Sequence, residues 1–143
     1  MKTVQQVLDV KGRDVWCIEP DATVREALGR MAEKDVGALV VTEEDHPVGL
    51  IDERDYARKV IMKDRSSPQT LVKEIMSSPV HHVGPTQTVD ECMTIMTAKR
   101  VRHLPVVEGS KLVGLVSIGD LVKSIITEQQ STIDQLEHYI QGY

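Results

Sequence analysis

The chain has 143 residues, a formal net charge of −5, 41% hydrophobic residues and only 3% aromatic residues. This length fits one domain or two small units that share a core, and the composition predicts an aliphatic core. The acidic balance and the few aromatic rings argue against a nucleic-acid surface, which needs a basic face or stacking platforms. No apolar run reaches the roughly 20 residues of a membrane span and no signal peptide is indicated, so we expect a cytoplasmic protein without membrane partners.

The sequence contains an internal repeat. Residues 15–56 align with residues 80–121 at a constant offset of 65 residues, without a gap. Identical residues recur along the whole alignment, from Pro20 and Pro85 to Asp55 and Asp120. Each copy of such a repeat is one supersecondary unit that needs a partner for its apolar face. We therefore predict two half-cores packed together, with related clefts between them.

The first copy predicts the element order β-α-β-β-α. An extended stretch at 15–18 ends before Pro20, and Thr23 with Glu26 forms a capping box at the start of a helix. Two strand-like runs separated by polar turn residues predict a hairpin, and a second helix starts near 52–55. In copy one the lead-in helix spans residues 4–8 and the two strands span 38–41 and 47–51. In copy two the lead-in spans 71–76, the extended stretch 80–83 and the two strands 104–107 and 111–116.

These elements predict an α/β (α+β) fold with pseudo-two-fold symmetry and a C-terminal helix. We assign residues 1–62 to the first repeat with its lead-in, 63–70 to a polar linker, 71–127 to the second repeat and 128–143 to a helical tail. The tail carries apolar residues near helical spacing. Two interpretations stay open: the stripe covers the core of its own chain, or it packs against a second copy.

Enzyme signatures are missing from the sequence. It contains no nucleophile elbow, dinucleotide fingerprint or P-loop, so we expect no catalytic residues. Cys17 and Cys92 are isolated and occupy different repeat positions, which favours two reduced thiols. His81, His82 and His103 lack metal-ligand spacing, and adjacent histidines of a strand point to opposite faces, so we expect no metal.

The candidate binding residues lie at the ends of the second hairpin strands. Copy two has Ser117 and Asp120 at the start of a helix, and copy one has Asp52 and Asp55 there. A hydroxyl and a carboxylate at this place form a capping box, and the helix N-terminus also favours an anion. The capping interpretation alone explains these residues.

The whole pattern resembles the cystathionine-beta-synthase (CBS) domain. Residues 101–107, Val-Arg-His-Leu-Pro-Val-Val, followed by residues 114–120, Gly-Leu-Val-Ser-Ile-Gly-Asp, are a well-recognised form of its motif. The resemblance covers almost the whole chain as a tandem pair, a stand-alone Bateman module. It implies that an adenosine ligand binds in the clefts between paired repeats: AMP, ADP, ATP or NAD(H), with S-adenosylmethionine ranked behind them.

The resemblance also implies roles for single residues. Asp120 is expected to bind the ribose hydroxyls, Ser117 to face the phosphate or ribose, and Arg102 and His103 to face the phosphate. Val116 is expected to flank the base, and backbone groups of Val15, Trp16 and Cys17 to line the adenine slot.

The pseudo-symmetric site is expected to be weaker. It would use Asp55 for ribose, with Asp52 where copy two has Ser117, and a second carboxylate there repels a phosphate. Its other residues would be Arg54, Gly37, Ala38, Ile51, Val80, His81 and His82. Because Gly37 and Ala38 replace Arg102 and His103, we expect the ligand in the cleft of copy two.

The leading hypothesis for function is therefore a regulatory nucleotide sensor that signals to a regulated protein. The alternative is a dimerisation scaffold that binds no nucleotide. The resemblance further implies a homodimer through the second helices, at residues 56–62 and 121–126.

Overall fold

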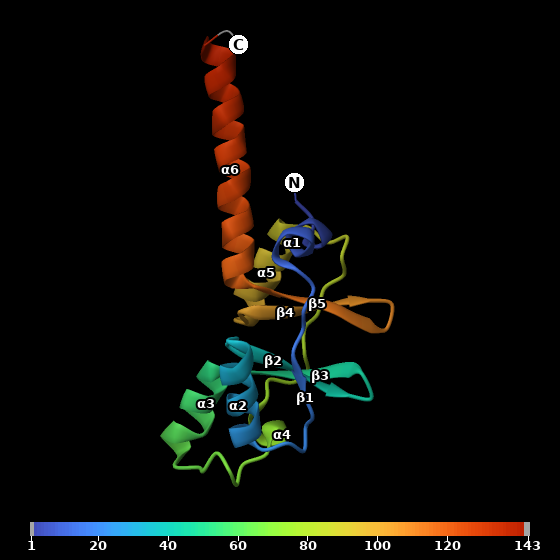
Figure 1. Cartoon of the computed structure of the whole chain (residues 1–143), viewed down its shortest axis with the longest axis vertical. Helices are drawn as coiled ribbons and strands as arrows, with labels where there is room; N and C mark the ends of the chain where they lie inside the picture. Colours follow the sequence, from blue (N-terminus) through green and yellow to red (C-terminus); the bar gives the residue numbers. More distant parts are fainter. Residues whose placement is uncertain (1, 142–143) are drawn as a thin grey trace.

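The computed structural model describes residues 2–141 and confirms the predicted mixed fold of two repeats (Figure 1). The last two residues of the expected tail lie outside the described part. The elements of repeat one are β1 (Cys17–Ile18), α2 (Val24–Lys34), β2 (Ala38–Glu43), β3 (His46–Asp52), α3 (Glu53–Lys59) and the 3-10 turn η1 (Ile61–Lys63). Those of repeat two are α5 (Val89–Lys99), β4 (His103–Glu108), β5 (Lys111–Ser117) and α6 (Ile118–Gln141).

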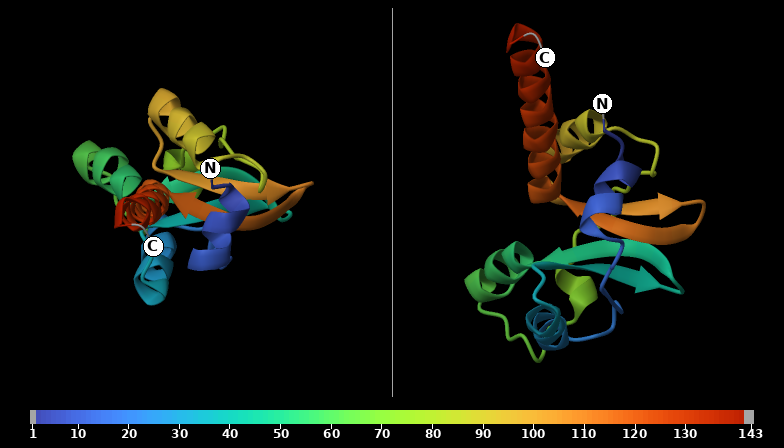
Figure 2. Two further views of the ribbon diagram at one scale, coloured as in Figure 1. Left: turned by 90° about the horizontal axis from the view of Figure 1, so that it is seen from above. Right: turned by 45° about the horizontal axis from the view of Figure 1, so that its top comes forward.

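The sheets of the two repeats follow the 65-residue offset. β2 and β3 form an antiparallel hairpin, with β1 parallel to β2, and β4 and β5 form the matching hairpin of repeat two. The expected strand at 80–83 is reduced to one parallel bridge between Val83 and Val106, which corresponds to the pairing of Ile18 with Val41. Figure 2 shows the two hairpins stacked one above the other.

Threonine caps start the first helix of each repeat. The Thr88 Oγ1 accepts a 3.1 Å hydrogen bond from the Glu91 amide, and the Glu91 carboxylate accepts one from the Thr88 amide. At α2 the Thr23 Oγ1 accepts from the Glu26 amide at 3.1 Å, but no bond returns from Glu26 to the Thr23 amide. The capping box is thus complete at α5 and half-formed at α2.

The two lead-in helices are exchanged between the repeats. Helix α1 (Val4–Lys11) buries Val4 and Leu8 in the core of repeat two, and its Val4 amide donates to the Gln87 carbonyl at 2.8 Å. Helix α4 (Val72–Ile75) instead packs in the core of repeat one. Each half-core therefore contains a helix that precedes the other repeat in the chain. The residues after α1 and after α4 must cross between the repeats, where the clefts lie.

The predicted second helix and tail form one continuous helix, α6. Its first turns bury Leu121 and Ser124 and pack against α1 and α5. The later turns of the helix project away from the body of the molecule (Figure 1). No helix of residues 2–141 is both long and apolar enough to cross a membrane.

Candidate functional site

Two clefts lie at the boundary between the repeats, one beside each carboxylate that starts a second helix. The Asp55 cleft has a volume of about 230 Å³ and the Asp120 cleft about 430 Å³. The Asp55 cleft is lined by Leu50, Asp52, Arg54, Asp55, Arg58, Lys59, Ser77, Pro79, Val80, His81, Arg100, Val101, Arg102 and His103. The Asp120 cleft is lined by Lys11, Gly12, Asp14, Trp16, Asp35, Val36, Gly37, Ala38, His103, Leu115, Ser117 and Asp120.

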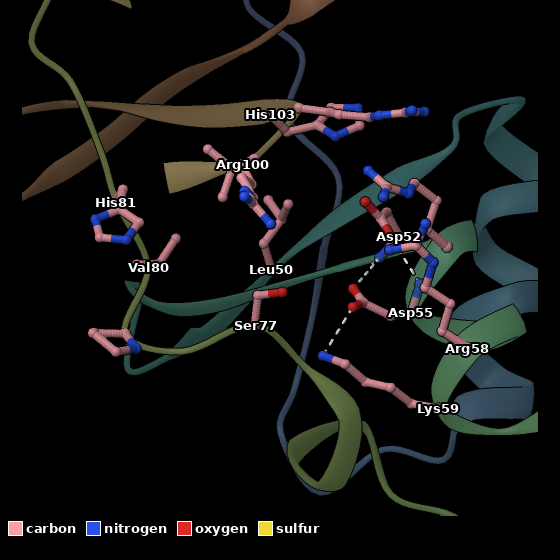
Figure 3. Close-up of a pocket in the computed structure, with 14 residues that line it drawn as sticks. Leu50, Asp52, Asp55, Arg58, Lys59, Ser77, Val80, His81, Arg100 and His103 are labelled. Atoms are coloured by element: carbon pink, nitrogen blue, oxygen red, sulfur yellow. Dashed lines mark hydrogen bonds and ion pairs between the residues drawn. The ribbon is translucent and has the colours of Figure 1, made fainter. Parts of the chain in front are cut away.

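Asp55 is held by a cap and by a lysine. Its Oδ2 accepts a 3.0 Å hydrogen bond from the Asp52 amide, and its own amide donates to Asp52 Oδ1 at 2.9 Å. The Lys59 ammonium lies 3.0 Å from Asp55 Oδ1 (Figure 3). Burial raises the pKa of Asp55 above its ordinary value, and the Lys59 hydrogen bond and Asp52 amide offset this only in part. Both carboxylate oxygens are thus engaged, and the residue is only 8% exposed.

Asp120 has a similar cap but a different lysine. Its Oδ2 accepts from the Ser117 amide at 2.8 Å and from the Lys11 ammonium at 2.6 Å, while its amide donates to the Ser117 Oγ at 3.1 Å. Burial alone would raise the pKa of Asp120, but the Lys11 ammonium and Ser117 amide outweigh it and hold the pKa below its ordinary value. Among residues 2–141 no hydrogen-bond donor contacts Oδ1. One oxygen of Asp120 is thus available to a ligand.

The structure corrects the expected grouping of residues around these carboxylates. Arg102, expected beside Asp120, lines the Asp55 cleft, whereas Gly37 and Ala38, expected beside Asp55, line the Asp120 cleft. The cause is the stacking of the hairpins: the residues before one hairpin reach the cleft beside the helix start of the other. The preference for the cleft of copy two rested in part on this grouping, and that part loses its support. The other part, the Asp52 carboxylate beside Asp55, agrees with the structure.

His103 belongs to both clefts. It is the first residue of β4, pairs with Ser117 of β5 and lines the Asp55 cleft as well as the Asp120 cleft. Burial lowers its pKa below the ordinary value, opposed by Asp52 and Asp120 and helped by Lys11 and Arg102. Its buried Nδ1 has no hydrogen-bond partner in the described part of the chain. A neutral imidazole therefore separates the two clefts.

Strand alternation corrects two further lining residues. Ile51 and Val116 are 1% and 0% exposed and belong to the cores of their repeats. The residues just before them, Leu50 and Leu115, line the clefts instead, because successive side chains of a strand point to opposite faces. The alternation was visible in the sequence and would have identified both leucines.

The segments expected to hold adenine are placed as follows. Trp16 lines the Asp120 cleft, with the Lys34 ammonium 4.4 Å from its ring centre, but Val15 and Cys17 line a different depression between the hairpin tips. The Trp16 carbonyl accepts from the Val40 amide at 3.1 Å, and the Cys17 carbonyl accepts from Arg30. These two carbonyls are thus already bonded, and the indole ring of Trp16 offers a stacking surface instead.

The corresponding segment of the other cleft contains Val80 and His81. Both side chains line the Asp55 cleft opposite Asp55 and Arg58 (Figure 3), whereas His82 is exposed and outside it. Asp52 and Arg54 lie in this cleft as expected.

The two clefts differ most in charge. Five cationic side chains and two carboxylates line the Asp55 cleft, whereas one lysine and three carboxylates line the Asp120 cleft. Arg100 and Asp35, one repeat offset apart, carry much of this difference. Both are left-handed C-caps, with φ of 55° and 54°, so the same backbone site holds a cation in one cleft and an anion in the other. Sequence reasoning missed both residues, although the offset pairs them.

The other nucleophilic and metal-binding side chains form no second site. Burial raises the pKa of the Cys92 thiol to about 11, and it also raises the pKa of Cys17. The thiol form of Cys92 therefore predominates at neutral pH. Within residues 2–141 no three His, Cys, Asp or Glu side chains are grouped to hold a metal ion.

Comparisons with known proteins agree with this architecture. The CBS domain family model matches residues 7–61 and 72–127. The CBS domain-containing protein CBSX3, mitochondrial, of Arabidopsis thaliana is 39% identical, over 98% of this chain and 72% of its own.

Solved structures show the same fold. A putative signal-transduction protein with CBS domains from Burkholderia ambifaria is 50% identical with a TM-score of 0.84, covering 90% of this chain and 96% of that chain. The CBS domain pair of MJ0100, in complex with 5-methylthioadenosine and S-adenosylmethionine, is 19% identical with a TM-score of 0.78, covering 90% of this chain and 98% of that chain. The chain therefore belongs to the CBS domain family and consists largely of two such domains in tandem.

Proposed function

We propose that the chain is a non-enzymatic regulatory sensor whose Asp55 cleft binds a phosphorylated adenosine ligand, such as AMP, ATP or NAD(H). The observation that carries the proposal is the gathering of five cationic side chains around Asp55, the carboxylate that we expect to bind ribose. Arginine suits this role because its planar fork binds phosphate oxygens in pairs. The ligand-bound CBS pair of the same fold supports the adenosine part of the proposal.

The Asp120 cleft suits a different adenosine compound. It is the larger of the two, carries a net negative lining and offers one open oxygen of Asp120 beside the Trp16 ring. Such a lining disfavours phosphate and favours an uncharged or cationic compound, such as adenosine or S-adenosylmethionine. Asp120 would bind the ribose there, with Ser117 beside it, in the roles that the family resemblance implies.

Signalling would follow from the exchanged helices. Lys11 of α1 holds Asp120, and Lys59 holds Asp55 and also donates to the Ile75 carbonyl of α4 at 2.9 Å. A ligand that binds either carboxylate would break or weaken its ion pair with the lysine. The packing of the lead-in helix that the lysine contacts would then change. A cytoplasmic regulated protein and a second copy of the chain are the partners we propose.

One observation favours the alternative, a scaffold that binds no nucleotide. Both expected ribose carboxylates already serve as caps and hold a lysine, so they have partners without a ligand. Thermal unfolding separates the two functions, because a ligand at 100 times its Kd adds about 2.7 kcal/mol of stability. If millimolar AMP, ATP, NAD, adenosine and S-adenosylmethionine all leave the unfolding temperature unchanged, the result would support the scaffold function.

Calorimetric titration of two matched variants tests the choice of cleft. Asp55→Asn and Asp120→Asn each keep an oxygen for the helix cap but remove the charge. A lost charge-assisted hydrogen bond costs about 1.5–3 kcal/mol, so we expect ATP to bind Asp55→Asn tenfold or more weakly. Asp120→Asn should leave ATP binding nearly unchanged. If Asp120→Asn weakens ATP binding more than Asp55→Asn does, the phosphorylated ligand binds in the Asp120 cleft instead.

A further inference from the structure

Helix α6 carries an apolar stripe from Val122 to Ile140 that the body of the chain leaves largely exposed. Its residues are 42–81% exposed. They are Val122, Ile126, Ile133, Leu136 and Ile140. The last turns of α6 project away from the rest of the chain in Figures 1 and 2. A helix stripe of this kind is stable in water only when another surface buries it.

The spacing of the stripe is that of a coiled coil. Ile126, Ile133 and Ile140 are seven residues apart, and Leu136 follows Ile133 by three, as at positions a and d of a heptad. Val122 and Gln129 occupy the other two d positions. This narrow seam fits one further helix and not a sheet or a broad core.

We propose that the seam pairs with α6 of a second copy in antiparallel orientation. In this register Val122 meets Ile140 of the second copy, Ile126 meets its Leu136, and Gln129 meets its Ile133. Every exposed apolar residue of the seam then has a partner. The inference extends the self-association included in the proposed function.

The flanking charges select the antiparallel orientation. Lys123 and Glu137 both occupy position e, and e faces e in an antiparallel pair. Lys123 therefore faces Glu137 of the second copy, twice by symmetry, with Gln130 facing Gln130 between them. In a parallel pair e faces g, so Lys123 and Glu137 would not meet.

The other flank carries apolar residues and a groove. Ile125 and Tyr139 occupy position g, and the antiparallel register places Tyr139 of the second copy beside Ile125. A groove lies at this place between α6 and the start of α5. It is lined by Asp90 of α5 and by Ile125, Glu128, Gln129, Thr132 and Ile133 of α6. The groove leaves room for the tyrosine ring, which is 84% exposed in the single chain.

Charge reversal with rescue tests the pairing. Lys123→Glu and Glu137→Lys each place like charges face to face at both ends, so we expect the dimer Kd from sedimentation equilibrium to rise about tenfold. The double variant restores opposite charges and should recover the wild-type Kd. The proposal would be overturned if the wild type is monomeric throughout the micromolar range, or if the single charge reversals leave the dimer Kd unchanged.

Disulfide trapping tests the orientation. Gln130→Cys places two thiols face to face in the antiparallel pair, whereas Ile126→Cys does so only in a parallel one. We expect oxidation to link Gln130→Cys and not Ile126→Cys, with the wild type as control for Cys17 and Cys92. The opposite result would contradict the orientation. Thermal shifts with ATP on the same variants report the clefts separately, so failure of the pairing is distinguishable from failure of nucleotide binding.

Discussion

The Lys11 ammonium donates a 2.6 Å hydrogen bond to Asp120 Oδ2 and so joins the N-terminal helix to the carboxylate in the first turn of α6. The same ammonium donates to the Leu115 carbonyl at 2.7 Å. In repeat one the cation that pairs with the carboxylate comes from the same helix, because Lys59 lies four residues after Asp55. Its counterpart in repeat two is Ser124, whose buried Oγ has no partner in the described part of the chain. The exchange of α1 supplies the missing cation.

Replacing Lys11 with Met should weaken the fold and strengthen ligand binding in the Asp120 cleft. The pair is partly exposed, so we expect a loss of about 1 kcal/mol in the free energy of unfolding. Adenosine should bind more tightly, because its ribose no longer competes with an ammonium for Oδ2. Urea unfolding and calorimetry measure the two effects, with the exposed Lys63→Met as control. Unchanged adenosine binding would contradict the competition.

The stability effect of Lys11→Met should depend on pH. The folded chain holds the pKa of Asp120 below its unfolded value of 3.8, so the carboxylate stabilises the fold above that pH and loses this effect as pH falls through the folded pKa. The difference between wild type and variant should therefore be full near pH 6 and vanish in acid. A difference that persists in strong acid would show that Lys11 acts through packing alone.

Helix exchange predicts a specific effect at Gly114. A Cβ there would lie 2.8 and 2.9 Å from the two methyl carbons of Leu8, which α1 inserts into repeat two. Overpacking of this kind typically costs about 1–3 kcal/mol, so Gly114→Ala should lower the free energy of unfolding. Gly29 has no atom within 4 Å of such a Cβ and lies inside α2, so Gly29→Ala should raise stability by about 0.5–1 kcal/mol. Urea unfolding of both variants tests the opposite signs.

The repeat made most of the fold predictable, but not the partner of each element. A constant offset and turn residues between alternating apolar runs determine which strands pair and where the helices begin. The exchange of α1 and α4 depends on how the two half-cores face each other, which no local pattern records. Arg102 was misplaced for the same reason, since its cleft is formed with the other hairpin. Leu50 and Leu115 needed only the alternation of strand side chains.

His103 should make stability fall as the solution becomes acidic. Burial lowers its pKa, so between the ordinary value of 6.5 and the folded pKa the unfolded chain takes up a proton that the folded chain excludes. Wild type should lose stability as pH falls through this interval, and His103→Gln should lose less. The exposed His46→Gln serves as the control in urea unfolding across that range. Parallel pH profiles of wild type and His103→Gln would contradict the assignment.

The charge difference between the clefts can be tested at Asp35, the counterpart of Arg100. Both residues occupy left-handed C-caps with nearly equal φ, and Arg100 shows that arginine is accommodated in this conformation. Asp35→Arg replaces a carboxylate of the Asp120 cleft with a cation, which should admit phosphate beside Asp120 and Ser117.

We therefore expect Asp35→Arg to bind ATP at a second site that the wild type lacks, seen as a doubled stoichiometry in calorimetry. Arg100→Ala should do the opposite and weaken ATP binding in the Asp55 cleft tenfold or more, because it removes a charge-assisted hydrogen bond of about 1.5–3 kcal/mol. Arg25→Ala, an exposed arginine of α2 outside both clefts, controls for net charge. If Asp35→Arg keeps the wild-type stoichiometry while Arg100→Ala loses affinity, then charge alone does not separate the clefts, and the Lys11 contact with Asp120 becomes the barrier to examine.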